Sequence, residues 1–229
     1  MVELKTEIEI EKLKALGSLT SKILKKVTRY VSAGMTTREI DKFTEKVCSE
    51  YDVKPAFKGY RGYPSAICIS INNEIVHGIP NEAVVIKSGD IVSLDFGTFK
   101  DGFYSDMAVT IPIGDVSEDD LKLINVTRES LYKGIEKAKV GNRLNDISYA
   151  IQRHVESNGF SVVRVFVGHG IGRSLHEDPQ VPNFGNPGCG IKLRAGMVLA
   201  IEPMVNAGTY DVLIKKDGWT AVTKDGKKS

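Results

Sequence analysis

The feature that most constrains the fold is a pair of apolar-rich runs at residues 90–100 and 103–112, separated only by Asp101-Gly102. An Asp-Gly pair between two runs that alternate apolar and small polar residues is a strong signal for a tight two-residue turn. The sequence therefore predicts a long antiparallel hairpin. Any fold proposed for the chain has to accommodate two strands of about this length side by side.

Counting outward from the turn predicts the register of the hairpin. Asp95 falls opposite Ala108 and Gly97 opposite Asp106, so the two aspartates share one face as diagonal neighbours, about 7–8 Å apart. Carboxylates at this separation can converge on one divalent ion or bridge two. The alternative is a pair of solvated acids on an exposed strand face. Asp is disfavoured inside strands, however, and Asp95 follows the apolar run IVSL, which indicates burial.

Four segments carry helical patterns. In the first, a Thr followed three residues later by Glu forms a capping box, and apolar residues then recur at helical spacing. The second and third begin in the same way, with an acid three residues after the cap, and the fourth ends at an Asn-Gly pair typical of a helix C-terminus. The starts are Thr6, Thr36 and Ser117, and the last segment ends at Asn158-Gly159.

The order of elements repeats along the chain. Two helices precede the strand-like runs AICISI and DIVSLDFGTF, and two more precede FSVVRVFVG, GMVLAIEPMV and GWTAVT. No linker or low-complexity stretch separates the halves. We therefore predict one domain over residues 1–229, of class α+β, with an internal pseudo-two-fold arrangement and its helices on one side of an antiparallel sheet.

Composition excludes several classes of protein. The 31 basic and 29 acidic residues nearly cancel, so nucleic acid is not an implied partner. The N-terminus lacks the apolar core of a signal peptide, and no segment approaches the length of a membrane span. The three cysteines, Cys48, Cys68 and Cys189, form no CxxC pair, which argues against both a disulfide framework and a thiolate zinc site. We expect a cytoplasmic protein.

Glu202 and His169 extend the candidate site beyond the hairpin. Glu202 ends the apolar run GMVLAIE, and a buried carboxylate needs a cation, a metal ion or, in the simplest alternative, a salt bridge to Lys or Arg. His169 lies between two glycines, where a ligand can approach closely, although it could also be an ordinary loop histidine. His77 and His176 are left as groups that could hydrogen-bond a substrate, or as plain polar loop residues.

Taken together, Asp95, Asp106, His169 and Glu202 make an oxygen-rich site with one nitrogen, each residue lying at or near a strand end. This ligand set suits Mn, Fe, Co or Zn better than a thiolate site would.

Five motifs together resemble type I methionine aminopeptidases, in order and over essentially the whole chain. They are YPSAICISINNEIVHGIP, DIVSLDFGTFKDGFYSDMAVT, FVGHGIGRSLHEDPQVPNFG, GMVLAIEPMV and KDGWTAVTKDG. The resemblance implies the pita-bread fold and a hydrolase that removes the initiator methionine from nascent polypeptides when the second residue is small. It also implies one or two divalent metal ions, of Co, Mn, Fe or Zn.

The resemblance assigns roles to individual residues. The metal ligands would be Asp95, Asp106, His169 and Glu202, with Glu202 also relaying a proton. His77 and His176 would be the catalytic and substrate-binding histidines. The methionine pocket would consist of Phe57, Tyr60, Tyr63, Cys68, Leu175 and Trp219, since aromatic rings and a soft sulfur suit a thioether. We expect a monomer, and a contact with the ribosome stays open.

The sequence departs from the family pattern at its end. That pattern continues past TKDG with a strand carrying a further metal-bridging Glu, whereas this sequence ends at Ser229. We expect it to be a truncation of a longer gene product, in which a second metal ion would be held more weakly. The alternative is a pita-bread protein that has become a non-catalytic binding module. Prolidase and aminopeptidase P share the fold and ligand types, but they usually carry an extra N-terminal domain for which residues 1–60 leave no room.

Overall fold

The computed structural model describes residues 2–229 and contains four long helices with twelve short or long strands. The helices are α1 (Glu7–Tyr30), α2 (Thr37–Glu50), α3 (Glu118–Lys137) and α4 (Leu144–Ser157). The strands are β1 (Lys54–Pro55), β2 (Cys68–Ile71), β3 (Glu74–Val76), β4 (Ile91–Lys100), β5 (Phe103–Pro112), β6 (Ser161–Val162), β7 (Gly168–Gly170), β8 (Glu177–Val181), β9 (Leu199–Ala200), β10 (Val205–Asn206), β11 (Val212–Ile214) and β12 (Ala221–Thr223).

The predicted helix starts are confirmed. Thr6 caps α1, where its side chain accepts from the Glu9 backbone N–H while the Glu9 carboxylate accepts from the Thr6 N–H at 2.9 Å. The same reciprocal bonding begins α2 at Thr36 and α3 at Ser117. Each box satisfies backbone donors that the first helical turn leaves unpaired.

The predicted hairpin is confirmed residue by residue. Strands β4 and β5 pair over ten positions on each side, from Lys100 opposite Phe103 outward. The pairing places Asp95 opposite Ala108 and Gly97 opposite Asp106, as the two-residue turn requires. The long hairpin is the most regular strand pairing of the molecule and forms the base of the candidate site.

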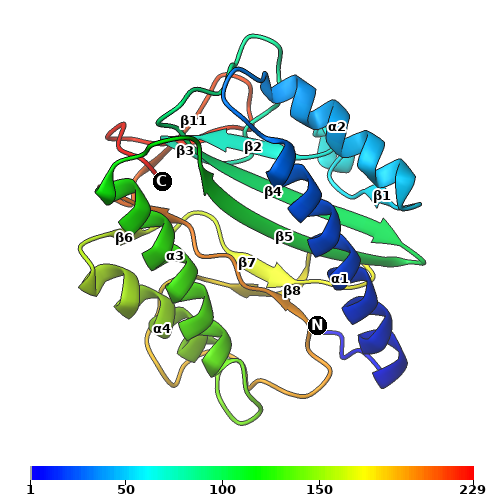
Figure 1. Cartoon of the computed structure of the whole chain (residues 1–229). Helices are drawn as coiled ribbons and strands as arrows, with labels where there is room; N and C mark the ends of the chain where they lie inside the picture. The colour runs from blue at the N-terminus through cyan, green and yellow to red at the C-terminus, as the bar shows by residue number, and fades with distance from the viewer. Residues whose placement is uncertain (1) are drawn as a thin grey trace.

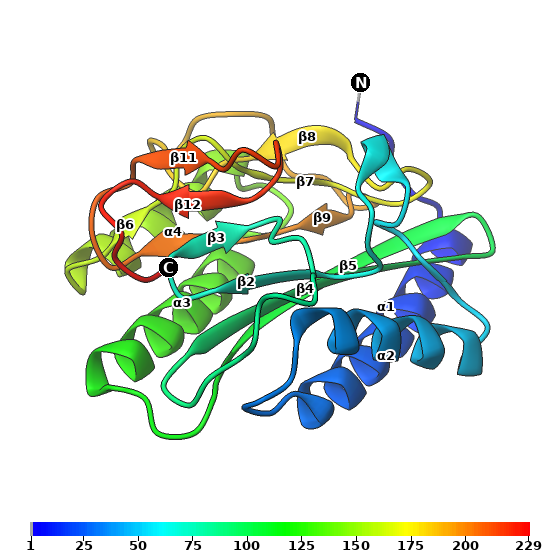
Figure 2. The ribbon, with the colours of Figure 1, turned by 90° about the horizontal axis from the view of Figure 1, so that it is seen from above.

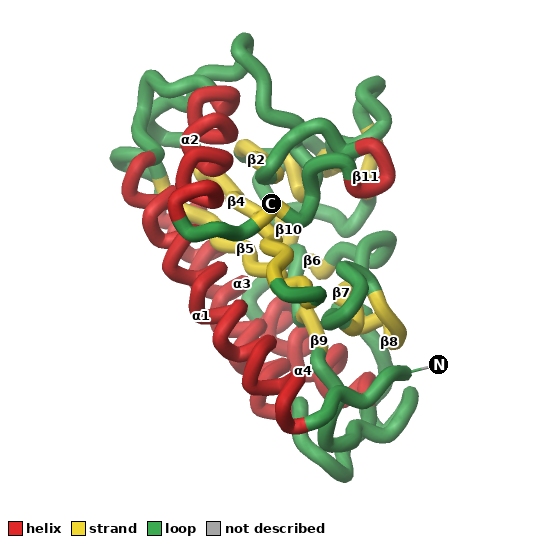
Figure 3. The backbone as a smooth tube through the Cα atoms, turned by 90° about the vertical axis from the view of Figure 1, so that its right-hand side faces the viewer, coloured by secondary structure: helices red, strands yellow, loops and turns green. Residues whose placement is uncertain are grey.

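The helices lie together on one side of the strands. Figure 2 shows α1, α2 and α3 on one side of the β4–β5 hairpin, with the short strands on the opposite side, and Figure 1 shows α4 packed beside α3, next to the later strands. Figure 3 shows the strands between the helices and a layer of loops. The predicted α+β arrangement, with helices on one side of antiparallel strands, is confirmed.

The strands of the second half are much shorter than the sequence suggests. The run FSVVRVFVG forms a strand at Ser161–Val162 and again only at its last residue, where β7 begins, and GMVLAIEPMV contributes to two separate pieces, β9 and β10. Hydrogen bonding is accordingly divided among four sheets, with orders β1-β4-β2 plus β5, β10-β6, β11-β12-β3 and β8-β7-β9. The prediction of long continuous strands here is wrong. Only part of each run is buried: Val162, Val163 and Val205 are fully buried, whereas Val165 is 67% exposed.

Two main apolar cores follow the two halves. The first packs α1 and α2 against β2 and β4, and it includes the fully buried Ile23, Ile40 and Phe96. The second packs α3 and α4 against the later strands, with Ile147 and Ile151 at its centre. The strand β3 of the first half pairs with β12 of the second, so the halves interlock.

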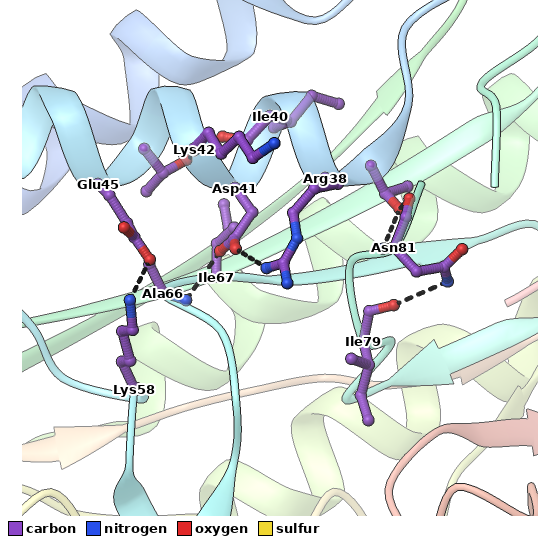
Figure 4. A network of polar contacts seen from close by, with 12 residues as sticks. Arg38, Ile40, Asp41, Lys42, Glu45, Lys58, Ala66, Ile67, Ile79 and Asn81 are labelled. Carbon is purple, nitrogen blue, oxygen red and sulfur yellow. Dashed lines mark hydrogen bonds and ion pairs between the residues drawn. The ribbon is translucent and has the colours of Figure 1, made fainter. Parts of the chain in front are cut away.

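Helix α2 also holds two segments that lead to the candidate site. The buried carboxylate of Asp41 accepts from the Ala66 backbone N–H and from Arg38, both at 2.8 Å (Figure 4). Thr37 exchanges two hydrogen bonds with the backbone of Asn81. These contacts fix the chain just before Cys68 and just after the loop that carries residue 77.

Among the described residues, no helix combines the length and apolar character that a membrane crossing requires.

Candidate metal centre

Asp95 and Asp106 reach the site from the long hairpin. They lie on adjacent strands, one on β4 and one on β5, as diagonal neighbours. Gly97, which pairs with Asp106, has no side chain, and a Cβ atom there would lie 2.8 Å from the Phe57 ring. The ladder of backbone hydrogen bonds therefore fixes both carboxylates, while the glycine admits an aromatic ring beside them.

His169 reaches the site from β7, a three-residue strand between β8 and β9. A Cβ on Gly168 would lie 2.3 Å from the Ala200 carbonyl oxygen, and one on Gly170 would lie 2.2 Å from that of Asp178. Only glycine fits at either position. Nδ1 of His169 lies 2.8 Å from the Gly170 carbonyl oxygen. In the neutral tautomer that donates from Nδ1, Nε2 carries the free lone pair, and a metal-binding imidazole needs that lone pair.

Glu202 comes from the irregular segment between β9 and β10. The buried amide of Asn183 donates to the Glu202 carbonyl oxygen at 2.8 Å and so holds its backbone. The side-chain Oε1 lies 3.1 Å from Nε2 of His169. Within residues 2–229 this buried oxygen has no hydrogen bond of good geometry.

Three of the four predicted ligands form a tight cluster. One ligand atom from each of Asp106, His169 and Glu202 lies within 4.8 Å of the other two. Nε2 of His169 is 3.7 Å from Oδ2 of Asp106. Asp95 lies outside this set of three but interacts with it electrostatically, because the charges of Asp106 and Glu202 act on its buried carboxyl group.

The cluster is electrostatically unfavourable without a cation. Burial, and then the charges of Asp106 and Glu202, raise the pKa of Asp95 well above its ordinary value. Burial likewise raises the pKa of Glu202, with Asp106 adding to the effect. Burial works against a charge on His169, but the neighbouring carboxylates of Asp106 and Glu202 raise its pKa to about 10. All three pKa values are raised, so the crowded carboxylates favour a proton, or another positive charge, between them.

These observations meet the requirements of a divalent metal ion. The donor set combines carboxylate oxygens with one imidazole nitrogen, which suits Mn, Fe, Co or Zn. The buried Oε1 of Glu202 lacks a hydrogen bond of good geometry within residues 2–229, and the neighbouring acids repel one another. An ion of charge +2 would remove both costs at once.

His176 and His77 flank the cluster. The ring of His176 lies 4.1 Å from that of His169 between centroids, and its Nδ1 is 2.9 Å from the Tyr60 hydroxyl. Burial, together with the charge of His169, lowers the pKa of His176 to about 4. His77 has a left-handed backbone, with φ of 62°, and packs edge-on against Phe166. Burial lowers its pKa as well. Both imidazoles are therefore neutral near pH 7.

The six predicted pocket residues pack in one apolar cluster beside the metal cluster. Its members are the predicted Phe57, Tyr60, Tyr63, Cys68, Leu175 and Trp219, together with Ala56, Ile79, Tyr104, Ile171, Val198 and Ala200. Cys68 pairs with Asp95 across β2 and β4, so the apolar cluster adjoins the ligands. Burial raises the pKa of its thiol well above the ordinary range, and the thiol stays neutral.

Several of these contributors were not singled out from the sequence. Ala56 and Ile171 look like ordinary core residues, and nothing in their local sequence separates them from other apolar positions. Asn183 follows a Val-Pro pair in a segment that reads as a loop. A buried Asn that holds a backbone carbonyl depends on a contact 19 residues along the chain, which no local pattern encodes.

Comparison with known proteins places these features in a family. Residues 11–225 match metallopeptidase family M24. The chain is 54% identical to the methionine aminopeptidase of Clostridium perfringens and 48% identical to methionine aminopeptidase 1 of Bacillus subtilis. In both comparisons the match covers all of this chain and 92% of the relative.

Solved structures agree. The crystal structure of methionine aminopeptidase from Thermotoga maritima superimposes with a TM-score of 0.97 at 50% identity, over 100% of this chain and 92% of that one. Prolidase from Pyrococcus furiosus matches with a TM-score of 0.76 at 22% identity, over 95% of this chain and 64% of that one, which shows a shared fold alone. The chain therefore belongs to metallopeptidase family M24, and the Clostridium, Bacillus and Thermotoga proteins that it matches over 92% of their length are methionine aminopeptidases.

Proposed function

We propose that this protein is a metal-dependent aminopeptidase that removes methionine from the N-termini of peptides and nascent polypeptides when the second residue is small. The observation that carries the proposal is the adjacency of two clusters. Asp106, His169 and Glu202 converge within 4.8 Å, and the apolar cluster of aromatic rings around Cys68 lies against them. A thioether side chain seated in that cluster would bring the first peptide bond to the metal ligands.

The ion would be held by the carboxylates of Asp95, Asp106 and Glu202 and by Nε2 of His169. When bound, a divalent ion supplies two things: it lowers the pKa of a water molecule towards neutrality, and it polarises the carbonyl of the first peptide bond. We propose one or two ions, of Co, Mn, Fe or Zn, on the basis of the donor atoms.

Glu202 would also act as the proton carrier. Its Oε1 is free of good hydrogen bonds, and its pKa is raised by burial, so it accepts and releases a proton more readily near neutral pH than an exposed glutamate does. A carboxylate that both binds and relays can pass a proton to the leaving amine without a separate base.

The two neutral histidines would bind the substrate. His176 has its Nδ1 engaged by Tyr60, which leaves Nε2 to hydrogen-bond the carbonyl oxygen or the leaving nitrogen. His77 is held by Phe166 and Trp219 in edge-on contacts. Because their pKa values are lowered, both rings enter the reaction as neutral donors.

The apolar cluster would provide selectivity for methionine. Cys68 gives a neutral, polarisable sulfur, and Tyr63 and Trp219 meet edge-on with ring centroids 5.1 Å apart. An unbranched thioether fits between such groups better than a branched side chain does.

We place the reaction in the cytoplasm, where nascent chains emerge.

The test uses the whole chain, stripped of metal with a chelator and then supplied with Mn²⁺ or Co²⁺. Met-Ala-Ser, Leu-Ala-Ser and Met-Trp-Ser peptides are incubated with it, and the released amino acid is quantified. We expect methionine release from Met-Ala-Ser alone, and none without metal. Metal binding with no release from any peptide would refute the activity and favour a non-catalytic binding protein. A parallel metal titration by calorimetry counts the ions bound.

A further inference from the structure

A short turn at residues 172–177 carries two groups of the candidate site. It contributes Leu175 to the apolar cluster and His176 to the flank of the metal cluster. Within it, the Gly172 N–H donates to the Ser174 carbonyl at 3.1 Å, and the Tyr104 N–H donates to that of Gly172 at 2.7 Å. Below, these six residues are called the 172–177 turn. Its backbone has few bonds of its own, so something else must set its position.

A lysine from the N-terminus lies beneath this turn. The side chain of Lys5 is only 1% exposed, and its Nζ lies 2.6 Å from Oε2 of Glu177. The other oxygen of the same carboxylate, Oε1, accepts from the Ser174 backbone N–H at 3.0 Å. One carboxylate therefore joins the buried ammonium group to the backbone of the 172–177 turn.

Lys5 is itself fixed on both sides. Its backbone N–H donates to the Gly196 carbonyl at 2.7 Å. Its stem passes over Gly172 so closely that a Cβ atom on that residue would lie 2.2 Å from the lysine Cε. The lysine thus cannot move far without moving the turn.

The neighbouring charges on the same turn are of a different kind. Arg173 pairs with Glu3 and Glu9, but its side chain is 53% exposed. Exposed pairs of this sort are screened by water and hold a segment weakly. The Lys5 ammonium also lies 3.5 Å from Glu3, but that side chain is 55% exposed, so Glu177 is the nearer and more buried of the two partners. Loss of a buried partner costs more than loss of an exposed one, because water does not replace it.

We propose that the Lys5–Glu177 ion pair is a positioning pair that sets the 172–177 turn, and with it the ring of His176, for the reaction. The inference rests on the proposed function and adds two residues to it. Lys5 precedes the first helix and Glu177 begins β8, so the pair joins the N-terminus to the second half of the chain beside the candidate site. Neither residue needs to touch the substrate.

The test compares three variants of the full chain. Glu177→Gln keeps an acceptor for the Ser174 N–H but sets an amide against the ammonium group of Lys5. Lys5→Met keeps most of the buried stem and removes the charge. The double variant leaves no buried charge unpaired. Lys26→Met is the matched control, because it breaks the exposed pair of Lys26 with Glu50, whose side chains are 43% and 41% exposed.

Kinetics with Met-Ala-Ser are measured well below every melting temperature. We expect each single variant to lower kcat about 10-fold or more, and to change KM by a smaller factor. The double variant should regain most of the lost kcat. The melting temperatures of Glu177→Gln and Lys5→Met should fall by roughly 5–15 °C, and that of the control Lys26→Met by far less.

A second readout does not depend on activity. The chain has four histidines, so the imidazole signals of ¹⁵N-histidine-labelled protein are few enough to assign. In Glu177→Gln and Lys5→Met, we expect the signals of His176 to shift while those of His154 on α4 stay in place. If the wild type releases no methionine, the proposed function fails, and this measurement still decides the positioning.

The result that would overturn the inference is clear. A lowered melting temperature with unchanged kcat, unchanged KM and unchanged His176 signals would make the pair purely structural. Single variants indistinguishable from Lys26→Met in every measurement would show that the pair positions nothing.

Discussion

The two regions that supply the metal ligands are built in opposite ways. Asp95 and Asp106 stand on the β4–β5 hairpin, where ten consecutive residue pairs hold the register. His169 and Glu202 stand on or beside strands of two or three residues, interrupted by a register shift next to His169. One region relies on repeated backbone hydrogen bonds, the other on a few close contacts between particular atoms.

The site should therefore tolerate the loss of a single contact better in the hairpin than in the second region. In the hairpin, the loss of any one contact leaves many others to keep the strands aligned. In the second region, His169 keeps its place because Gly168 and Gly170 let carbonyl oxygens approach to distances that no side chain allows. Precision there depends on individual residues, and the following predictions test this contrast.

The largest expected effect comes from the second region. His176→Ala should lower kcat for Met-Ala-Ser by about 10²–10⁴, because a neutral donor beside the reacting carbonyl is lost. His154→Ala, which removes an imidazole on α4 that pairs with Glu129, is the control and should leave kcat unchanged. Steady-state kinetics decide the matter. A loss of less than about threefold would remove His176 from the reaction.

A pair of glycine substitutions compares the two scaffolds directly. Gly168→Ala sets a Cβ 2.3 Å from the Ala200 carbonyl oxygen, a backbone atom that cannot yield without breaking β7 from β9. Gly97→Ala sets a Cβ 2.8 Å from the Phe57 ring, a side-chain contact, and 3.2 Å from its nearest backbone atom, the Ser105 carbonyl oxygen, so the overlap is smaller. We expect Gly168→Ala to lower the free energy of unfolding by about 3 kcal/mol or more and Gly97→Ala by about 1–2 kcal/mol.

Urea denaturation of the two variants measures both values. Metal affinity should follow the same order, because only Gly168→Ala displaces the backbone of a ligand. Equal losses in both variants would mean that the second region is as adaptable as the hairpin, and the contrast drawn above would fail.

Metal removal should make the stability of the protein depend on pH. Without metal, the pKa values of Asp95 and Glu202 are raised from ordinary values of 3.8 and 4.5, so above those values the folded chain binds more protons than the unfolded one. Its free energy of unfolding therefore falls as the pH rises from about 4. His169, with a pKa raised from 6.5 to about 10, acts in the same direction at higher pH.

A divalent ion competes with these protons, so it should stabilise the protein more at pH 7.5 than at pH 5. At 100 times its dissociation constant, Mn²⁺ should add about 2.7 kcal/mol at the higher pH. Melting temperatures with chelator and with Mn²⁺, at both pH values, measure the effect. Asp106→Asn should abolish the shift, and a shift equal at both pH values would contradict the electrostatic account.

The sequence predicted the hairpin site well because its signals are local. An Asp-Gly turn sets the register by counting, and that counting placed Asp95 and Asp106 correctly on neighbouring strands. The capping boxes at Thr6 and Thr36 likewise depend on residues only three apart. Where structure is decided within a few residues, a single sequence is enough.

The second region was predicted in outline only. Apolar runs such as FSVVRVFVG indicated burial, but burial does not distinguish a strand from a bent, packed segment. Beyond Val162 the run divides: Val163 and Phe166 pack in a separate small cluster with Ile75 and Met204, and Val165 is exposed. The contact of Asn183 with the Glu202 carbonyl and that of Lys5 with Glu177 join residues far apart in the sequence. Such contacts are set by the whole fold.

The three cysteines differ in a way that bears on chemical damage. Burial raises the pKa of the Cys48 thiol to about 12 and that of Cys68 well above its ordinary value, whereas Cys189 is exposed on a loop. Because the thiolate is the reactive form, oxidants and alkylating reagents meet Cys189 first. Cys68, whose sulfur belongs to the proposed methionine pocket, is protected because it is buried. A fluorescent maleimide would label the protein at one surface position and leave the pocket chemically untouched.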